Sequence, residues 1–459
     1  MYALLRRVWN RLRSMQNLNP ARIVVFSFGG IILVGTLLLM LPVSARAGVP
    51  TGGFTALFTA TSATCVTGLV LVDTWAHWSL FGQAVILVMI QLGGLGFMTV
   101  ITLASFLLRR RIGLSQRLII VSTLNLSDMD GVVRVVRHAL MGTCLLEGVG
   151  AVVLAACFFP EYGLAGGLWR GIFHSVSSFC NAGFDLMGSE GSFSSLVNYR
   201  GNPVVLITVM LLVVAGGLGF FVWEDLLENR WKLKKLSTYS KMVLLLTAFL
   251  LAGGALFFLM VEWGNAATLG EMPVWEKGLN AVFQSVTLRT AGFNTLPQEG
   301  LRDSSLAMSC ILMLVGGSSG STAGGLKTAT VGVLFLALRS GLAGRDEVTL
   351  RRRTIPHRQV TNAITLTLIV IIVFQAGAMI LSLADGIPFL SAAFEVASAM
   401  GTVGVTTGIT PSLSRFSQGM LTCMMFLGRV GIMSFSIAFL SRGRRAAKIK
   451  YPAMDMMIG

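Results

Sequence analysis

Four short segments of this chain share a pattern that suits the coordination of a cation by the protein backbone. Each begins at a Phe, continues through small and hydroxyl residues, and reaches one glycine that an apolar residue follows. The segments are 58–69, 173–184, 283–293 and 394–405, and their glycines are Gly68, Gly183, Gly292 and Gly404; the third segment is one residue shorter. Glycine permits backbone angles that turn carbonyl oxygens toward a common axis, and rings of carbonyl oxygens replace the hydration shell of K⁺ in selectivity filters.

Side chains for other kinds of chemistry are scattered along the sequence. The four histidines are His77, His138, His174 and His357, and the six cysteines are Cys65, Cys144, Cys157, Cys180, Cys310 and Cys423. The cysteines fall in apolar or small-residue stretches without a Cys-x-x-Cys pair, which favours small buried side chains over metal ligands or disulfides. We therefore expect neither an enzyme nor a cofactor bound by this chain, with a membrane enzyme or a scaffold as remote alternatives.

A second glycine pattern follows each of the first four. It reads LeuGlyGly at 92–94, AlaGlyGly at 215–217, ValGlyGly at 315–317 and LeuGlyArg at 427–429. Close packing between membrane helices explains these glycines but not the first set, which follows stretches too short to cross a membrane. Two patterns in the same order, four times over, predict a fourfold internal repeat.

The composition indicates the elements that carry these repeats. Of 459 residues, 54% are hydrophobic and only 12% are charged, about half the ~25% of a soluble protein, and the mean hydropathy is +0.76. Apolar windows long enough to cross a bilayer lie at 23–42, 79–108, 139–159, 203–223, 242–261, 306–338, 363–383 and 417–440. Within each successive pair lies a half-length apolar stretch, at 54–64, 169–179, 278–288 and 389–400, which predicts a re-entrant helix.

The net charge of +16 reports membrane topology. Lys and Arg gather at both termini and in every second connection, at 109–137, 230–241 and 339–358. This alternation is the positive-inside pattern and predicts cytoplasmic N- and C-termini. We expect no nucleic acid partner.

These features predict an all-α polytopic membrane protein with four tandem membrane–pore-loop–membrane repeats around one central pore. The expected parts are a cytoplasmic N-terminus at 1–22, repeats at 23–108, 109–230, 231–340 and 341–441, and a cytoplasmic C-terminus at 442–459. If the half-length helices enter from outside, their C-terminal ends carry about half a negative charge toward the centre, which favours a cation there.

The sixth apolar window is interrupted at 316–328 by five glycines, four hydroxyl side chains before Ala323, and Lys327. Such a stretch does not suit a lipid-facing helix and has to line a cavity or be buried in protein. Arg429 also lies inside a window, at a cost of roughly 3 kcal/mol, and is either a pore residue or a structural clamp. For the buried Glu147 we favour a structural hydrogen bond over ion binding. Asp185 and Asn294, two residues past filter glycines, either concentrate cations at the outer mouth or do nothing specific.

Taken together, these residues resemble the Trk/Ktr/HKT potassium-transport superfamily over about residues 20–445. Eight windows without a further N-terminal helix pair are more similar to the KtrB-like membrane subunit of bacterial Ktr systems than to TrkH. The resemblance implies a filter of three residues per repeat: Val66, Thr67, Gly68; Asn181, Ala182, Gly183; Thr290, Ala291, Gly292; and Thr402, Val403, Gly404. Relatives with serine at the first filter glycine tend to pass sodium, so Gly68 implies potassium. The implied gate consists of Gly316, Gly317, Ser318, Ser319, Gly320, Ser321, Thr322, Ala323, Gly324, Gly325 and Lys327, together with Arg429.

The resemblance also implies a cellular setting. The expected protein is a potassium-translocating subunit in the bacterial inner membrane, surrounded by membrane lipid. The resemblance further implies a homodimer of such chains on a cytosolic RCK-type (KtrA-like) ring that binds the nucleotide, with sodium stimulating uptake. The alternative is a TrkH-like potassium or sodium transporter with different ion coupling.

Overall fold

A computed structural model of the chain describes residues 20–431 except 97–131, 190 and 352. The predicted cytoplasmic termini, apart from residues 20–22, and most of the basic connection at 109–137 lie outside these residues. The described part is built almost entirely of helices, with one two-stranded antiparallel hairpin of β1 (Thr349–Leu350) and β2 (Arg353–Thr354). Short 3₁₀ turns occur at Pro42–Ser44, Val197–Tyr199, Leu233–Lys235, Gln298–Gly300 and Thr410–Ser412.

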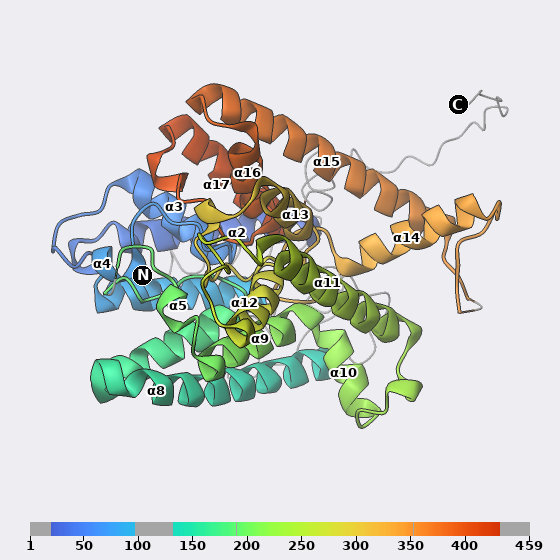
Figure 1. The fold of residues 1–459 in the computed structure, drawn as a ribbon, viewed down its shortest axis with the longest axis horizontal. Helices are drawn as coiled ribbons and strands as arrows, with labels where there is room; N and C mark the ends of the chain where they lie inside the picture. The colour runs from blue at the N-terminus through green and yellow to red at the C-terminus, as the bar shows by residue number, and fades with distance from the viewer. Residues whose placement is uncertain (1–19, 97–131, 190, 352, 432–459) are drawn as a thin grey trace, which may run out of the picture.

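Four helices are long and apolar enough to cross a membrane: α2 (Pro20–Leu39), α8 (Val132–Phe179), α11 (Thr238–Glu262) and α15 (His357–Asp385). Only 22% to 33% of their apolar windows is buried inside the protein, so most of each apolar surface is free to face lipid. In Figure 1, α8 and α15 run along opposite edges of the molecule with α12 between them. The chain is therefore a multi-pass helical membrane protein, as the sequence predicts.

The four predicted half-length helices are present. They are α3 (Gly53–Thr64), residues 164–179 of α8, α12 (Val274–Thr287) and α16 (Phe389–Gly401). The second follows directly from the preceding span, because α8 contains one non-helical residue, Gly163, with φ 68° and ψ −179°. These pore helices are enclosed by the longer helices; in α16, every residue from Ala392 to Gly401 is buried.

The second helix of each repeat is shorter than the sequence predicts. The predicted span over 203–223 is bent and not continuous, and α5 and α17 stop before the ends expected for 79–108 and 417–440. The window at 306–338 is interrupted, as the sequence predicts. The second helices are α5 (Leu80–Leu95), α9 (Pro203–Leu218), α13 (Asp303–Leu314) and α17 (Arg415–Val430). Residues 97–108 and 432–440 of the predicted spans lie outside the described part.

The physical reason for three of these breaks is a glycine outside the helical region. Gly96, Gly219 and Gly431 follow their helices with φ of 77°, 88° and 87°, a conformation that glycine adopts at little cost. After Gly219 the chain continues as α10 (Phe220–Glu228), bent by 93° from α9. In the third repeat the break is a loop from Val315 to Lys327, followed by α14 (Thr328–Leu342). The remaining short helix, α4 (Thr74–His77), lies between α3 and α5.

The apolar core sits around the pore helices. One cluster joins α2, α3 and α5 to residues 173–186, α16 and α17; a second joins α11, α12, α13 and α16; a third joins α8, α9 and α12. Each pore helix thus packs against helices of its own repeat and of a neighbouring one. This packing holds the loops at their C-terminal ends close to one another.

Candidate functional site

The loops that follow the four pore helices share one backbone shape. The first predicted filter residue has a left-handed φ in every repeat, at Val66 (56°), Asn181 (60°), Thr290 (68°) and Thr402 (53°). The glycine two residues later also has a positive φ, at Gly68 (95°), Gly183 (69°), Gly292 (89°) and Gly404 (94°). A positive φ at non-glycine residues is uncommon, so its recurrence in four different sequences identifies one structural unit built four times.

The four loops close into a ring. A Cβ atom placed on each glycine would collide with the carbonyl oxygen of the middle filter residue in the next repeat. The distance would be 2.5 Å from Gly68 to Ala182 O, 2.8 Å from Gly183 to Ala291 O and 2.5 Å from Gly292 to Val403 O, and Gly404 meets Thr67 O in the same way. The last contact returns to the first repeat. The structure therefore brings all four glycines and their neighbouring carbonyls together around one axis.

A hydroxyl at one position of each pore helix fixes the loop that follows it. In repeats 1 and 4 the hydroxyl accepts a hydrogen bond from the filter glycine, from Gly68 N to Ser62 Oγ (3.1 Å) and from Gly404 N to Ser398 Oγ (3.0 Å). In repeats 2 and 3 it donates to the carbonyl after the glycine, from Ser177 Oγ to Phe184 O (2.7 Å) and from Thr287 Oγ1 to Phe293 O (2.6 Å). These hydroxyls are not among the residues predicted from the sequence, although their alignment across the repeats is a signal that could identify them.

A buried polar side chain just after the first Phe of each of repeats 2, 3 and 4 fastens the outer part of the loop. The carboxylate of Glu395 accepts hydrogen bonds from Thr406, Thr407 and Thr410 at 2.6 to 3.2 Å. The amides of Gln284 and Gln298 bond to each other, at 2.7 and 3.1 Å. His174 Nε2 accepts from Leu186 N at 3.4 Å. These side chains hold the loop in place and, with their hydrogen bonds made to the protein, are not turned to an ion.

Asp185 and Asn294 lie on the outer loops of repeats 2 and 3, and both are half-buried. One carboxylate oxygen of Asp185 accepts from Met187 N at 3.0 Å. The backbone N–H of Asn294 donates to Ser195 Oγ at 3.0 Å. Their effect on cations at the mouth stays a prediction.

The predicted gate stretch forms a closed loop with a narrow neck. Gly316 N donates to Leu326 O (2.9 Å), Leu326 N to Leu314 O (3.1 Å) and Thr328 N to Gly317 O (3.0 Å). The two ends of the loop therefore lie side by side between α13 and α14. The residues between them form the body of the loop.

The tip of this loop contacts the filter at the ends of two pore helices. Thr322 Oγ1 lies 3.2 Å from both Phe179 O and Asn181 Oδ1 in repeat 2. In repeat 4, a Cβ atom on Gly324 would overlap the side chain of Thr402. The loop thus reaches between two repeats on the side of the filter where the pore helices end.

The loop is also bonded to the glycine pattern of α9. Ser318 N donates to Gly217 O (3.0 Å) and Thr322 N to Gly216 O (3.2 Å). These carbonyls are free to accept because α9 ends there. The broken span of repeat 2 therefore provides a second support for the loop.

Arg429 clamps the loop to the first repeat. Its Nη1 donates to Thr322 O, and its Nη2 donates to Gly93 O (2.5 Å) and Gly94 O (3.0 Å). Lys327 Nζ donates to Ala323 O at 2.7 Å. In the described part of the chain, neither cation forms an ion pair with a carboxylate. Arg429 thus has the contacts of a carbonyl clamp and lies beside the candidate pore, so the two interpretations left open by the sequence are compatible.

Glu147 accepts hydrogen bonds from Gln91 Nε2 at 3.1 and 3.2 Å and from the Cys180 thiol at 3.8 Å. It joins α5 and α8 behind the second filter segment. These contacts are those of a structural hydrogen-bond acceptor.

The second set of glycines packs against the C-terminal ends of the pore helices. A Cβ atom on Gly93, Gly216 or Gly428 would overlap the carbonyl oxygen of Thr64, Phe179 or Met400 respectively. These glycines therefore have the close-packing role that the sequence suggested. They also bring the ends of α5, α9 and α17 to the level of the filter.

Comparison with known proteins agrees with this architecture. The chain is 40% identical to the potassium/sodium uptake protein NtpJ of Enterococcus hirae over 452 residues, which cover 97% of this chain and 99% of that protein. It is 35% identical to the Ktr system potassium uptake protein B of Bacillus subtilis over 440 residues, 96% of this chain and 97% of that one. The crystal structure of the potassium transporter TrkH from Vibrio parahaemolyticus superposes with a TM-score of 0.71 at 16% identity, covering 91% of this chain and 84% of that chain, and so shares the fold.

A match to a protein family covers nearly the whole chain. Residues 10–444 match the TrkH family, which is described as cation transport proteins. The match includes all four filter loops, the interrupted sixth window and Arg429. The chain therefore belongs to the TrkH family of cation transport proteins.

Proposed function

We propose that this chain is the potassium-translocating membrane subunit of a Ktr-type uptake system. The observation that carries the proposal is the closed ring in which each of four glycines abuts a carbonyl of the next repeat. Two left-handed residues in each loop suit a backbone whose successive carbonyls face one side. Carbonyls arranged in this way would take the place of water around a dehydrated cation. The proposed filter consists of three consecutive residues in each repeat, and these sets end at Gly68, Gly183, Gly292 and Gly404.

Two observations favour potassium as the ion. The relatives from Enterococcus hirae and Bacillus subtilis are named for potassium/sodium and potassium uptake. The filter glycine of the first repeat is Gly68, and the family resemblance implies potassium for glycine there, because relatives with serine at that position tend to pass sodium. Sodium remains the second candidate ion, in a TrkH-like transporter with different coupling, because the first relative is named for both ions.

The same proposal assigns the loop 316–328 and Arg429 to a gate. The loop touches the filter residues Asn181 and Thr402 and is bonded to Arg429. An ion leaving the filter on that side would meet the loop. The loop therefore has to move for ions to pass, and its movement would break the bonds of Arg429.

The setting follows from the Ktr relationship. We assign the chain to the bacterial inner membrane with both termini in the cytoplasm, the repeats bounded as the sequence predicts, and a homodimer on a nucleotide-binding RCK-type ring, with sodium stimulating uptake. α14 and the adjoining end of α15 extend away from the rest of the chain in Figure 1. This extension carries Arg339, Arg345, Arg353 and Arg358. A basic projection of this kind offers a docking surface for a cytosolic partner.

Rescue of a bacterial strain that lacks its own potassium uptake systems tests the proposal. Cells that express the chain together with a Ktr regulatory subunit should grow at low potassium and take up ⁸⁶Rb⁺. Excess K⁺ should compete with this uptake far better than excess Na⁺. Absence of uptake, with the chain present in the membrane fraction, would refute potassium translocation. Equal competition by Na⁺ and K⁺ would favour the sodium alternative.

A further inference from the structure

The third pore helix ends in a buried arginine that the filter itself does not use. Arg289 directly precedes the filter residue Thr290 and is 8% exposed. The equivalent positions in the other three repeats hold Cys65, Cys180 and Gly401. A guanidinium buried at this depth is costly, so its contacts point to a role that only the third repeat requires.

The Arg289 guanidinium reaches both ends of the gate loop. Its Nη2 donates to Gly316 O at 3.2 Å and to Thr328 Oγ1 at 3.0 Å. Thr328 Oγ1 in turn donates to Gly316 O at 3.1 Å. Gly316 is the first residue of the loop and Thr328 the first residue after its neck. Hydrogen bonds from a charged donor are stronger than those between neutral groups, so this triangle is a firm closure of the neck.

The main chain of Arg289 contacts the ring of filter loops. Arg289 O lies 3.4 Å from Asn181 Nδ2, which also lies 3.3 Å from Thr290 Oγ1. Arg289 is therefore bonded to the filter through its main chain and to the gate loop through its side chain. A displacement of the loop neck would act directly on the residue that precedes the third filter segment.

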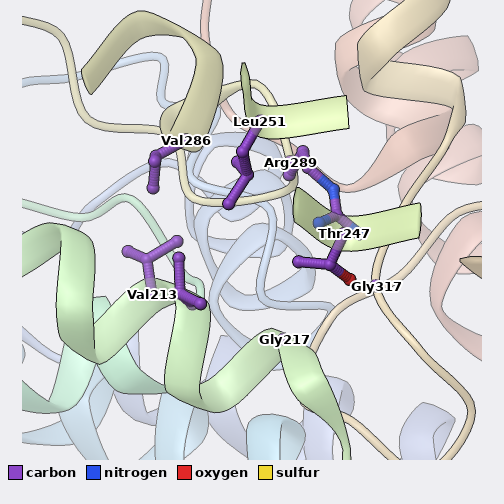
Figure 2. A pocket seen from close by; sticks show the side chains of 8 residues that line it. Val213, Gly217, Thr247, Leu251, Val286, Arg289 and Gly317 are labelled. Atoms are coloured by element: carbon purple, nitrogen blue, oxygen red, sulfur yellow. The ribbon is translucent and has the colours of Figure 1, made fainter. Parts of the chain in front are cut away.

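A small cavity lies beside the guanidinium, between α9, α11, α12 and the loop. It is lined by Val213, Leu251, Val286, Thr247 and Gly317 as well as Arg289, which Figure 2 shows together. In the described part of the chain, Arg289 Nε and Thr247 Oγ1 have no hydrogen-bond partner. The hydrogen bonds of the guanidinium are thus made to the neck of the loop.

We propose that Arg289 is a positioning residue that fastens the neck of the gate loop to the third pore helix and so holds the loop in its blocking position. Arg289 does not coordinate the ion. It acts through Gly316 and Thr328, and the partner has to break these bonds to move the loop. This inference rests on the proposed function, since it assigns a part in the gating of potassium flow.

Reconstituted full-length chain without a partner provides the test. Arg289→Met keeps an unbranched side chain and removes the donors, and ⁸⁶Rb⁺ influx into liposomes should rise about tenfold, the effect expected from the loss of one or two charge-assisted hydrogen bonds. Arg289→Lys should give an intermediate flux, because an ammonium group can still bond one of the two acceptors. Thr247→Val is the matched control: it lines the same cavity and lacks a partner, so its flux should equal that of the parent.

A second variant keeps the inference testable if Arg289→Met does not fold. Thr328→Val removes the hydroxyl shared by Arg289 and Gly316 and should also raise influx. Influx through the double variant Arg289→Met/Thr328→Val should be only slightly higher than through the more active single variant, because both changes remove the same set of hydrogen bonds at the loop neck. The ratio of Rb⁺ to Na⁺ uptake should stay at the parental value, because the filter glycines are untouched.

The outcomes separate the two levels of the proposal. A parent chain that carries no Rb⁺, with or without a partner, refutes the proposed function. If the parent conducts Rb⁺ but Arg289→Met and Thr328→Val show a flux no higher than that of the parent without partner, only the role of Arg289 is refuted. If the double variant shows the product of the two single fold increases in influx, Arg289 and Thr328 act independently. This result would also overturn the role of Arg289.

Discussion

Replacement of Gly68 by serine tests the carbonyl ring most directly. Gly68 has φ 95°, and a Cβ atom there would lie 2.5 Å from Ala182 O and 3.2 Å from Gly183 Cα. Both obstacles are backbone atoms of the next filter segment, so no flexible side chain can move aside. Serine at this position therefore has to displace either its own loop or the carbonyl that it faces.

The size of the effect follows from the strain. A non-glycine residue in the left-handed region costs roughly 1–3 kcal/mol. If this strain is relieved by moving the Ala182 carbonyl, the free-energy difference that favours K⁺ over Na⁺ in the filter falls by at most the same amount. Because 1.4 kcal/mol is a factor of ten, discrimination against sodium should fall by roughly 5- to 150-fold. The upper value applies if the whole strain acts on the ring.

The assay is competition of Na⁺ against ⁸⁶Rb⁺ uptake in liposomes, which compares ions within one sample and is independent of protein yield. Gly253→Ser is a suitable control, because Gly253 lies on the exposed face of α11 with nothing within 4 Å of a Cβ atom. It should retain the parental ratio. An unchanged ratio in folded Gly68→Ser protein would refute the assignment of Gly68 to the selectivity filter.

Three further outcomes are expected. Deletion of Ser318–Gly324 should raise partner-free flux at least as much as Arg289→Met, because it removes the segment that touches the filter; a folded deletion protein with parental flux would show that the gate lies elsewhere. Arg429→Gln should raise flux as well, since it loses the bonds to Thr322 and to the end of α5, and liposome influx equal to the parent's would contradict the clamp. A cysteine at residue 192 in a cysteine-free background should react with an impermeant thiol reagent on whole cells, and one at residue 353 only after permeabilisation; the reverse result would invert the topology.

The repeat made the architecture predictable from the sequence. A glycine follows each half-length stretch four residues after its end, and the pore helices α3, α12 and α16 begin and end within a few residues of the predicted ranges. Apolar windows also identified the long helices, because length and hydropathy are what membrane crossing requires. The four glycines could be aligned for the same reason, because their positions repeat, whereas the twelve filter residues were implied by the family resemblance and stay a prediction.

The breaks in the second helices could not be predicted in the same way. Gly96, Gly219 and Gly431 lie in apolar surroundings, and glycine is common within membrane helices that pack closely. The mean hydropathy of a sequence window is the same whether or not the backbone bends at one of its residues. The positive φ of these three glycines and the 93° bend after α9 appear only in the structure.

The gating contacts were hidden for a different reason, which is that they join residues far apart in the chain. Arg289 reaches Gly316 and Thr328, and Arg429 reaches residues 93, 94 and 322. The sequence showed that an arginine inside a membrane window needs a partner, but backbone carbonyls are partners that every residue provides. Composition therefore identified Arg429 as unusual without indicating what it binds, and Arg289, at the edge of a short apolar stretch, attracted no attention.

Several departures from fourfold symmetry lie in the third repeat, and they would suit a ring that carries the single predicted gate. That repeat has the shorter pore segment, the arginine before its filter, and the loop in place of a continued second helix. The filter needs four equivalent backbones, so the repeats agree in φ at the first and third filter residues. A blocking segment needs only one copy, because four loops would compete for one axis. The loop is accordingly tied to its own repeat by Arg289, to repeat 2 through Asn181 and the end of α9, and to repeats 1 and 4 through Arg429. With anchors in all four repeats, the position of the loop depends on how the repeats are arranged, so a small rearrangement of the repeats would move the loop on the side of the filter where the pore helices end.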